Sequence, residues 1–318
     1  MRKFVLIVGL ALSVSAQTPP ADDKPSVKVG GMIFADYTLQ PEGVDAFNIG
    51  RAQFNVTGNL NRWITFRLTP DIARESGSGS SLAGSYTFRL KYAYAQFNLD
   101  QWMAKGTWVR FGMQQTPYLE FTEGAYRYRF QGTLFPERVL SFFTVSDTGI
   151  TMRYPLPGDR GDIHGGFYNG EGYTRAEQND QKAFQLRATY IPIKGLKLTA
   201  FVIEDHYASD SKRERFLGQI SYQHPRYTLG LELLRATDQT VRSKGWSAWA
   251  MPKLGSKGWE LLLRHDDYEE TERNIAGIAY WLPNLDKVTA AAMLDYDSLR
   301  QPTGADDTRY GLKLLISF

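Results

Sequence analysis

The last ten residues, 309–318 (RYGLKLLISF), alternate between polar and apolar side chains. Successive side chains of an extended strand point to opposite faces, so this alternation predicts a β-strand with one apolar and one polar face. The apolar face carries Tyr310, Leu312, Leu314, Ile316 and Phe318, whereas Arg309, Gly311, Lys313 and Ser317 lie on the opposite face.

The same period of two recurs upstream, in about 16 segments of roughly ten residues between Val27 and Phe318. Aromatic residues fall repeatedly at the ends of the apolar faces, where a membrane barrel carries its interfacial girdles. No amphipathic helix of convincing length is predicted anywhere. The pattern therefore predicts an all-β fold.

The composition excludes several classes of protein. After the N-terminus no apolar run reaches about 18 residues, which excludes a helical membrane protein. The 18 Phe, 18 Tyr and 7 Trp are too many aromatic residues for a disordered chain. The absence of Cys excludes disulfides, thiolate catalysis and Cys-based zinc sites. A formal net charge of +3 gives no reason to expect nucleic acid as a partner.

The N-terminus has the features of a secretory signal peptide. Arg2 and Lys3 precede an apolar stretch at residues 4–14, and small residues lead up to a cleavage site after Ala16. A buried N-terminal helix is the alternative. We therefore divide the chain into a signal peptide at 1–16, a polar periplasmic extension at 17–26 and one barrel domain at 27–318.

The connectors between the predicted strands alternate in length, as the periplasmic turns and external loops of outer-membrane barrels do. The short connectors are residues 61–62, 192–195, 224–226, 253–258 and 283–286, and the longer ones are 70–85, 116–146, 169–180 and 298–306.

These observations predict a transmembrane antiparallel β-barrel of about 16 strands, in the outer membrane of a Gram-negative bacterium. Outer-membrane lipid and lipopolysaccharide would surround it. An aromatic residue that ends an alternating strand fits the signal read by the barrel-assembly machinery, so we expect Phe318 to be recognised there. An ordinary C-terminal strand is the alternative for this last feature.

Arginines recur on the polar faces of the early strands, which would line the lumen. Lys91 follows the same trend, although the register of residues 90–99 is ambiguous. Rings of basic residues in a pore favour anions, and guanidinium offers a fork of donors to phosphate or carboxylate. These arginines are Arg51, Arg67, Arg110, Arg153 and Arg187. Later strands mix both signs, with Glu232, Glu260, Arg264 and Asp266, which favours the alternative of a weakly selective general-diffusion pore.

The connector at 116–146 is much longer than its neighbours and rich in aromatic residues, so we expect it to pack inside the barrel as a constriction. An external lid or a trimer contact is the alternative. Its charged residues would set the narrowest charge pattern of the pore. They are Arg127, Arg129 and Arg138, with Glu120, Glu123 and Glu137.

Several short motifs occur in an order that resembles the phosphate-selective porin O and P family. They are the run 109–118 (VRFGMQQTPY), 135–139 (FPERV), 147–150 (DTGI), 167–172 (FYNGEG) and 259–266 (WELLLRHD). The resemblance spans most of the chain after the signal peptide. It implies a homotrimeric, 16-stranded channel for phosphate, pyrophosphate or other small anions, with basic residues at the constriction. The sequence departs from a lysine-rich phosphate binder, because it has 14 Lys against 23 Arg and no Lys within 116–146.

Enzymatic readings find little support in the sequence. The four histidines are scattered, and none stands in a Ser/Asp arrangement or a zinc-binding helix motif. We therefore expect a passive pore without cofactor or metal. A plugged structural barrel and a barrel enzyme are the alternatives from other classes.

Overall fold

The computed structural model describes residues 24–318, except 42, 76–78, 141–142, 208–210, 284 and 304–305. The predicted signal peptide at 1–16 lies outside the described residues, as does most of the predicted extension at 17–26.

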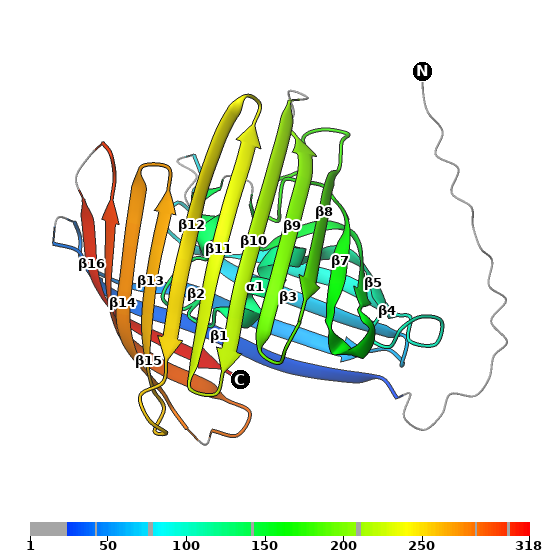
Figure 1. The fold of residues 1–318 in the computed structure, drawn as a ribbon, viewed down its shortest axis with the longest axis horizontal. Coiled ribbons are helices and arrows are strands. Elements are labelled where there is room, and N and C mark those ends of the chain that lie inside the picture. The colour runs from blue at the N-terminus through cyan, green and yellow to red at the C-terminus, as the bar shows by residue number, and fades with distance from the viewer. Residues whose placement is uncertain are drawn as a thin grey trace.

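Within the described residues, 16 antiparallel strands close into one barrel, in which each strand pairs with its neighbours in sequence (Figure 1). The predicted barrel fold and strand number are confirmed. The strands are β1 (Ser26–Leu39), β2 (Ala46–Asn59), β3 (Ile64–Arg74), β4 (Tyr86–Asn98), β5 (Trp108–Gln115), β6 (Ser146–Pro155), β7 (Gly161–Tyr168), β8 (Ala183–Tyr190), β9 (Leu196–His206), β10 (Lys212–His224), β11 (Tyr227–Asp238), β12 (Val241–Pro252), β13 (Trp259–Tyr268), β14 (Thr271–Trp281), β15 (Thr289–Arg300) and β16 (Asp307–Ser317).

The terminal strand that defines the sequence pattern also closes the barrel. β16 pairs with β1 from Met32 opposite Ser317 to Leu39 opposite Tyr310. Two backbone hydrogen bonds of 2.9 and 3.0 Å then join Gly31 to Phe318. Closure leaves no sheet edge with unpaired N–H and C=O groups, which a bilayer would not tolerate.

The alternating faces lie as the sequence predicts. Leu312, Leu314 and Ile316 point outward and remain 42–45% exposed, and Leu294 on β15 is 61% exposed. Aromatic pairs lie near the strand ends on this face, for example Trp259 and Tyr280 with ring centroids 4.9 Å apart. A continuous apolar exterior with aromatic margins is suited to contact with lipid.

The alternation of short and long connectors is less strict than the sequence suggests. On the side of the long connectors, residues 239–240 and 269–270 form two-residue turns, in which Gln239 and Glu269 have positive φ. On the opposite side, residues 99–107 form a nine-residue connector. The predicted number of strands is still correct, because it is derived mainly from the apolar faces of the strands and not from the lengths of their connectors.

The predicted connector at 70–85 is too long, because β3 continues to Arg74. A register shift between Thr69 and Pro70 lets the strand continue past the proline, since the extra residue Lys91 on β4 forms a bulge opposite it. Lys91 and Tyr92 are both buried, at 1% and 3% exposure. The bulge explains why the register of this strand is ambiguous in the sequence.

Two short helices lie in the connector between β5 and β6, where the sequence predicts none. They are α1 (Pro117–Ala125) and α2 (Phe135–Val139), each with a proline in its first turn, where a missing N–H is tolerated. A 3₁₀ turn, η1 (Pro157–Asp159), joins β6 to β7. None of the helices in the described part of the chain is both long and apolar enough to span a membrane.

Candidate pore lining and constriction

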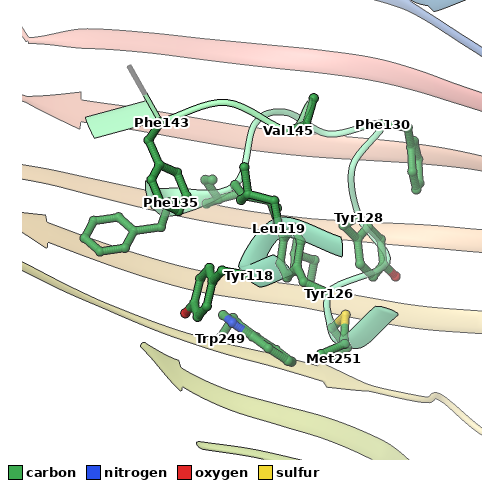
Figure 2. Close-up of a cluster of buried hydrophobic side chains, with 14 of the residues drawn as sticks. Tyr118, Leu119, Tyr126, Tyr128, Phe130, Phe135, Phe143, Val145, Trp249 and Met251 are labelled. Carbon is green, nitrogen blue, oxygen red and sulfur yellow. The ribbon is translucent and has the colours of Figure 1, made fainter. Parts of the chain in front are cut away.

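The connector at 116–145, which we call the β5–β6 loop, has an apolar side that packs against part of the barrel wall. Tyr118 stacks on Phe201 of β9 with centroids 5.3 Å apart, and Tyr126 meets Trp249 of β12 edge-on at 5.5 Å (Figure 2). Phe130 meets Trp281 of β14 at 5.7 Å. The other strand residues of this buried cluster also come from β1 or from β9 to β16.

Polar contacts join the same loop to the same strands. Arg138 donates to the Asp266 carboxylate of β13 at 3.0 Å, and Arg264 donates to both oxygens of that carboxylate at 2.7 Å. Asp266 is fully buried. Arg127 forms a two-point ion pair with Glu260, one bond of which is 2.9 Å long, and its guanidinium lies 3.9 Å from the centre of the Trp281 ring.

Two further hydrogen bonds extend this anchoring. The Tyr118 hydroxyl donates to Glu232 of β11 at 2.9 Å, and Gln131 donates to Asp295 of β15 at 3.0 Å. The carboxylates of the later strands, which indicate mixed charge in the sequence, therefore hold the loop to the wall.

The other side of the loop is charged. Arg129, 9% exposed, donates to Glu123 at 3.0 Å and to Glu137 at 2.6 Å. Burial opposes ionisation of Glu137, but the nearby Arg129, together with the charges of Arg51 and Lys91, outweighs burial and lowers its pKa. Both glutamates keep about a fifth of their side-chain surface, at 23% and 21% exposed, so this face of the loop reaches solvent.

Strands β5 and β8 also contact the charged side of the loop. Arg110 of β5 donates to both oxygens of Glu120 at 3.1 and 3.2 Å. Arg187 of β8 lies 5.0 Å from the centre of the Phe121 ring and pairs with Asp162 at 2.7 Å. Arg153 of β6 donates to the same aspartate at 2.5 Å. Each of these three strand arginines therefore contacts a carboxylate, although Arg153 and Arg187 share that of Asp162.

Arg51 and Arg67 differ from the other predicted arginines. Arg51 lies 4.9 Å from the centre of the Phe34 ring, and Arg67 lies 4.3 Å from that of Tyr92 while it donates to Thr69 and Asn55. Both are half-buried, and neither forms an ion pair among the described residues. Their guanidinium charge is therefore not cancelled by a contacting carboxylate.

The structure adds one basic residue, Arg89, that the sequence pattern does not single out. Arg89 lies on the same face of β4 as Lys91 and likewise makes no ion pair within the described ranges. Lys91, by contrast, forms an ion pair: it donates to Asp71 at 3.0 Å, and both side chains are buried. The period of β4 would have revealed Arg89 if the bulge at Lys91 had been recognised.

The described residues form no cluster of metal-binding side chains. Among the described residues, no three His, Asp or Glu side chains are arranged to hold an ion. The four histidines remain scattered, and His164 lies beside Trp108 and 3.7 Å from Glu120.

Comparison with solved structures finds the same architecture in bacterial porins. A complex of Salmonella typhi OmpF with daunomycin is 13% identical, with a TM-score of 0.69, and the match covers 95% of this chain and 100% of that one. An anion-selective porin from Comamonas acidovorans is 13% identical with a TM-score of 0.66, over 93% of this chain and 100% of the other. At such identity these likenesses show the fold alone.

A third similar structure is the trimer form of OmpT, an outer-membrane protein of Vibrio cholerae. It is 10% identical, with a TM-score of 0.57, over 93% of this chain and all of that one. No protein with curated annotation matches the sequence.

The sequence profile of one protein family matches residues 27–231, which is most of the barrel from β1 into β11. The matched range includes the β5–β6 loop and all the arginines discussed above except those on the late strands. The family indicated by the sequence motifs is thus confirmed. The chain belongs to the phosphate-selective porin O and P family.

Proposed function

We propose that this porin lets small hydrophilic solutes diffuse passively across the outer membrane with a preference for anions. The main support is that Arg51 and Arg67 contact no carboxylate in the described structure. Unpaired guanidinium on a pore wall attracts anions and binds them weakly enough for release. Phosphate-like anions are the solutes that the family's description suggests.

We further propose that the β5–β6 loop is the constriction of this pore. Its apolar side packs on β1 and β9–β16, so the solute would pass on its charged side, along β2–β8. In this arrangement Arg127 and Arg138 anchor the loop to β13 through Glu260 and Asp266, on the side away from the solute. Arg129, Arg110, Arg153 and Arg187 each contact a carboxylate, so we expect them to attract anions less than Arg51 and Arg67 do.

A weakly selective general-diffusion pore is the second candidate. It is favoured by the number of ion pairs, because most arginines named by the sequence argument contact a carboxylate. A plugged structural barrel or a barrel enzyme has no comparable support. We expect no catalysis and no cofactor.

The assembled form belongs to the same proposal. A homotrimer is suggested by the trimer form of the similar Vibrio cholerae protein. We also propose that cleavage near Ala16 precedes insertion, that lipid and lipopolysaccharide cover the apolar exterior, and that the barrel-assembly machinery recognises Phe318.

Planar-bilayer recording of the purified protein tests this proposal. Discrete conductance steps are expected, whereas a plugged barrel gives none. The reversal potential of Arg51→Gln in a KCl gradient should shift toward cations, and that of Arg138→Gln should shift less because Arg138 lies against Asp266 of β13, on the anchored side of the loop. Equal shifts in the two variants would contradict the assignment of the free charge to the β2–β3 wall.

A further inference from the structure

The charged side of the β5–β6 loop carries an excess of negative charge. Glu123 and Glu137 share the single guanidinium of Arg129, so one carboxylate charge is left over in this trio. Both glutamates retain solvent exposure while Arg129 is buried beneath them. The loop therefore presents a net negative surface to the space beside it.

Strands β2 and β3, which lie near this side of the loop through Phe34 and Phe130, carry the opposite sign. Arg51 and Arg67 have no contacting carboxylate, and Lys91 is balanced by Asp71. Arg51 lies close enough for its charge to lower the pKa of Glu137, yet it makes no ion pair with it. Opposite charges create an electric field between them when they lie near each other without forming a contact.

Aromatic packing holds the two charged surfaces in place. Phe34 lies under Arg51 and also meets Phe130 of the loop at 6.3 Å, so it joins the wall to the loop beside this space. Tyr92, 3% exposed, lies under Arg67. The separation of charge is thus built into packed side chains, and the two surfaces do not collapse into an ion pair.

From this juxtaposition we infer that the pore favours zwitterions over uncharged solutes of the same size. A carboxylate of the solute turns toward Arg51 and Arg67, and its ammonium group turns toward Glu123 and Glu137. Amino acids and short peptides have this separation of charge. The inference rests on the proposed function, because it uses the same constriction, but it differs in needing both signs of charge.

Liposome swelling provides the test. The zwitterion glycylglycine and the uncharged pentose arabinose, which are similar in size, are compared on proteoliposomes with the full-length mature protein. Arg51→Gln and Glu123→Gln should each lower the ratio of the two swelling rates by about threefold, the order of one charge acting at a few ångströms in a wet pore. Glu177→Gln is the matched control, since Glu177 pairs with Lys182 on the connector between β7 and β8.

Reversal potentials of the same variants separate this inference from the anion preference. Arg51→Gln should shift the potential toward cations and Glu123→Gln toward anions, although both lower the zwitterion ratio. If the potentials shift this way and the swelling ratios stay unchanged, the zwitterion inference is overturned and the anion preference stands. If Arg51→Gln does not move the potential, the proposed anion preference fails.

Charge-conserving variants cover the case of a poorly folded protein. Arg51→Lys and Glu123→Asp should keep the swelling ratio within about a factor of two of the wild type, since they keep both charges. A loss of the ratio in these variants as large as in the neutral ones would show that packing, and not charge, determines it, and would also overturn the inference.

Discussion

Asp266 anchors the β5–β6 loop, and its burial gives a magnitude for the cost of removing its charge. Asp266 is fully buried and binds both Arg264 and Arg138, whose side chains are 2% and 19% exposed. Asp266→Asn keeps the shape of the side chain but removes the charge, and it leaves two guanidinium groups near each other. Removal of one partner from a buried ion pair costs about 3–5 kcal/mol.

Because asparagine still accepts a hydrogen bond, we expect the lower end of that range, about 3 kcal/mol. This corresponds to an increase of roughly 150-fold in the equilibrium for opening the β5–β6 loop. Hydrogen exchange of peptides within 117–140, measured on the folded barrel, reports this opening. Exchange in β9–β12 serves as the internal reference.

Glu260→Gln is the matched control for this anchor. It also removes a carboxylate that binds a loop arginine, but Arg127 is 41% exposed and can be hydrated when its partner is lost. We expect a cost of about 1 kcal/mol, because the mutation removes the buried member of the pair and leaves the charge on the member that reaches solvent. Loop exchange in Asp266→Asn within twofold of the wild type, or an equally large effect of Glu260→Gln, would contradict a dominant role of Asp266 as the loop anchor.

Two other predictions follow from local features. The pKa of Glu137 is lowered because Arg129 outweighs the opposing effect of burial. The ionised carboxylate therefore stabilises the loop fully above about pH 4.3, and this stabilisation is lost as the pH falls through the lower pKa of the folded state. Hydrogen exchange of the loop should rise over this pH range in the wild type, and the rise should be absent in Glu137→Gln. Gly112 has φ of +121°, and an added Cβ would lie 2.3 Å from the Ala93 carbonyl oxygen, so Gly112→Ala should lower the folded fraction on a heat-modifiability gel. Gly124→Ala, where nothing lies within 4 Å of the added atom, should fold normally, and equal yields of the two variants would contradict this explanation.

The outward face of the barrel is predictable because it depends on a local rule. Tyr310, Leu312 and Leu314 alternate with polar residues, and lipid requires apolar side chains at each of these positions. The position of Arg51 on the inward face follows from the same period. Where a bulge breaks the period, at Lys91, the sequence becomes ambiguous and Arg89 is missed.

The pairing of the loop charges is not predictable in this way. Arg138 and Asp266 are 128 residues apart, and only closure of the barrel brings β13 to the loop. From the sequence, Arg127, Arg129 and Arg138 are expected to meet the solute, whereas in the structure each of them contacts a carboxylate. Which arginines stay unpaired is thus a property of the tertiary structure.

The reversal potential of the wild-type channel shows directly whether anions or cations pass more readily. It is measured on one purified preparation in a tenfold gradient of KCl and then of potassium phosphate. Because Arg51 and Arg67 carry positive charge with no contacting carboxylate, we expect a potential of the sign that anion permeation produces in both salts. A potential of the opposite sign, showing that cations pass more readily than chloride, would contradict it.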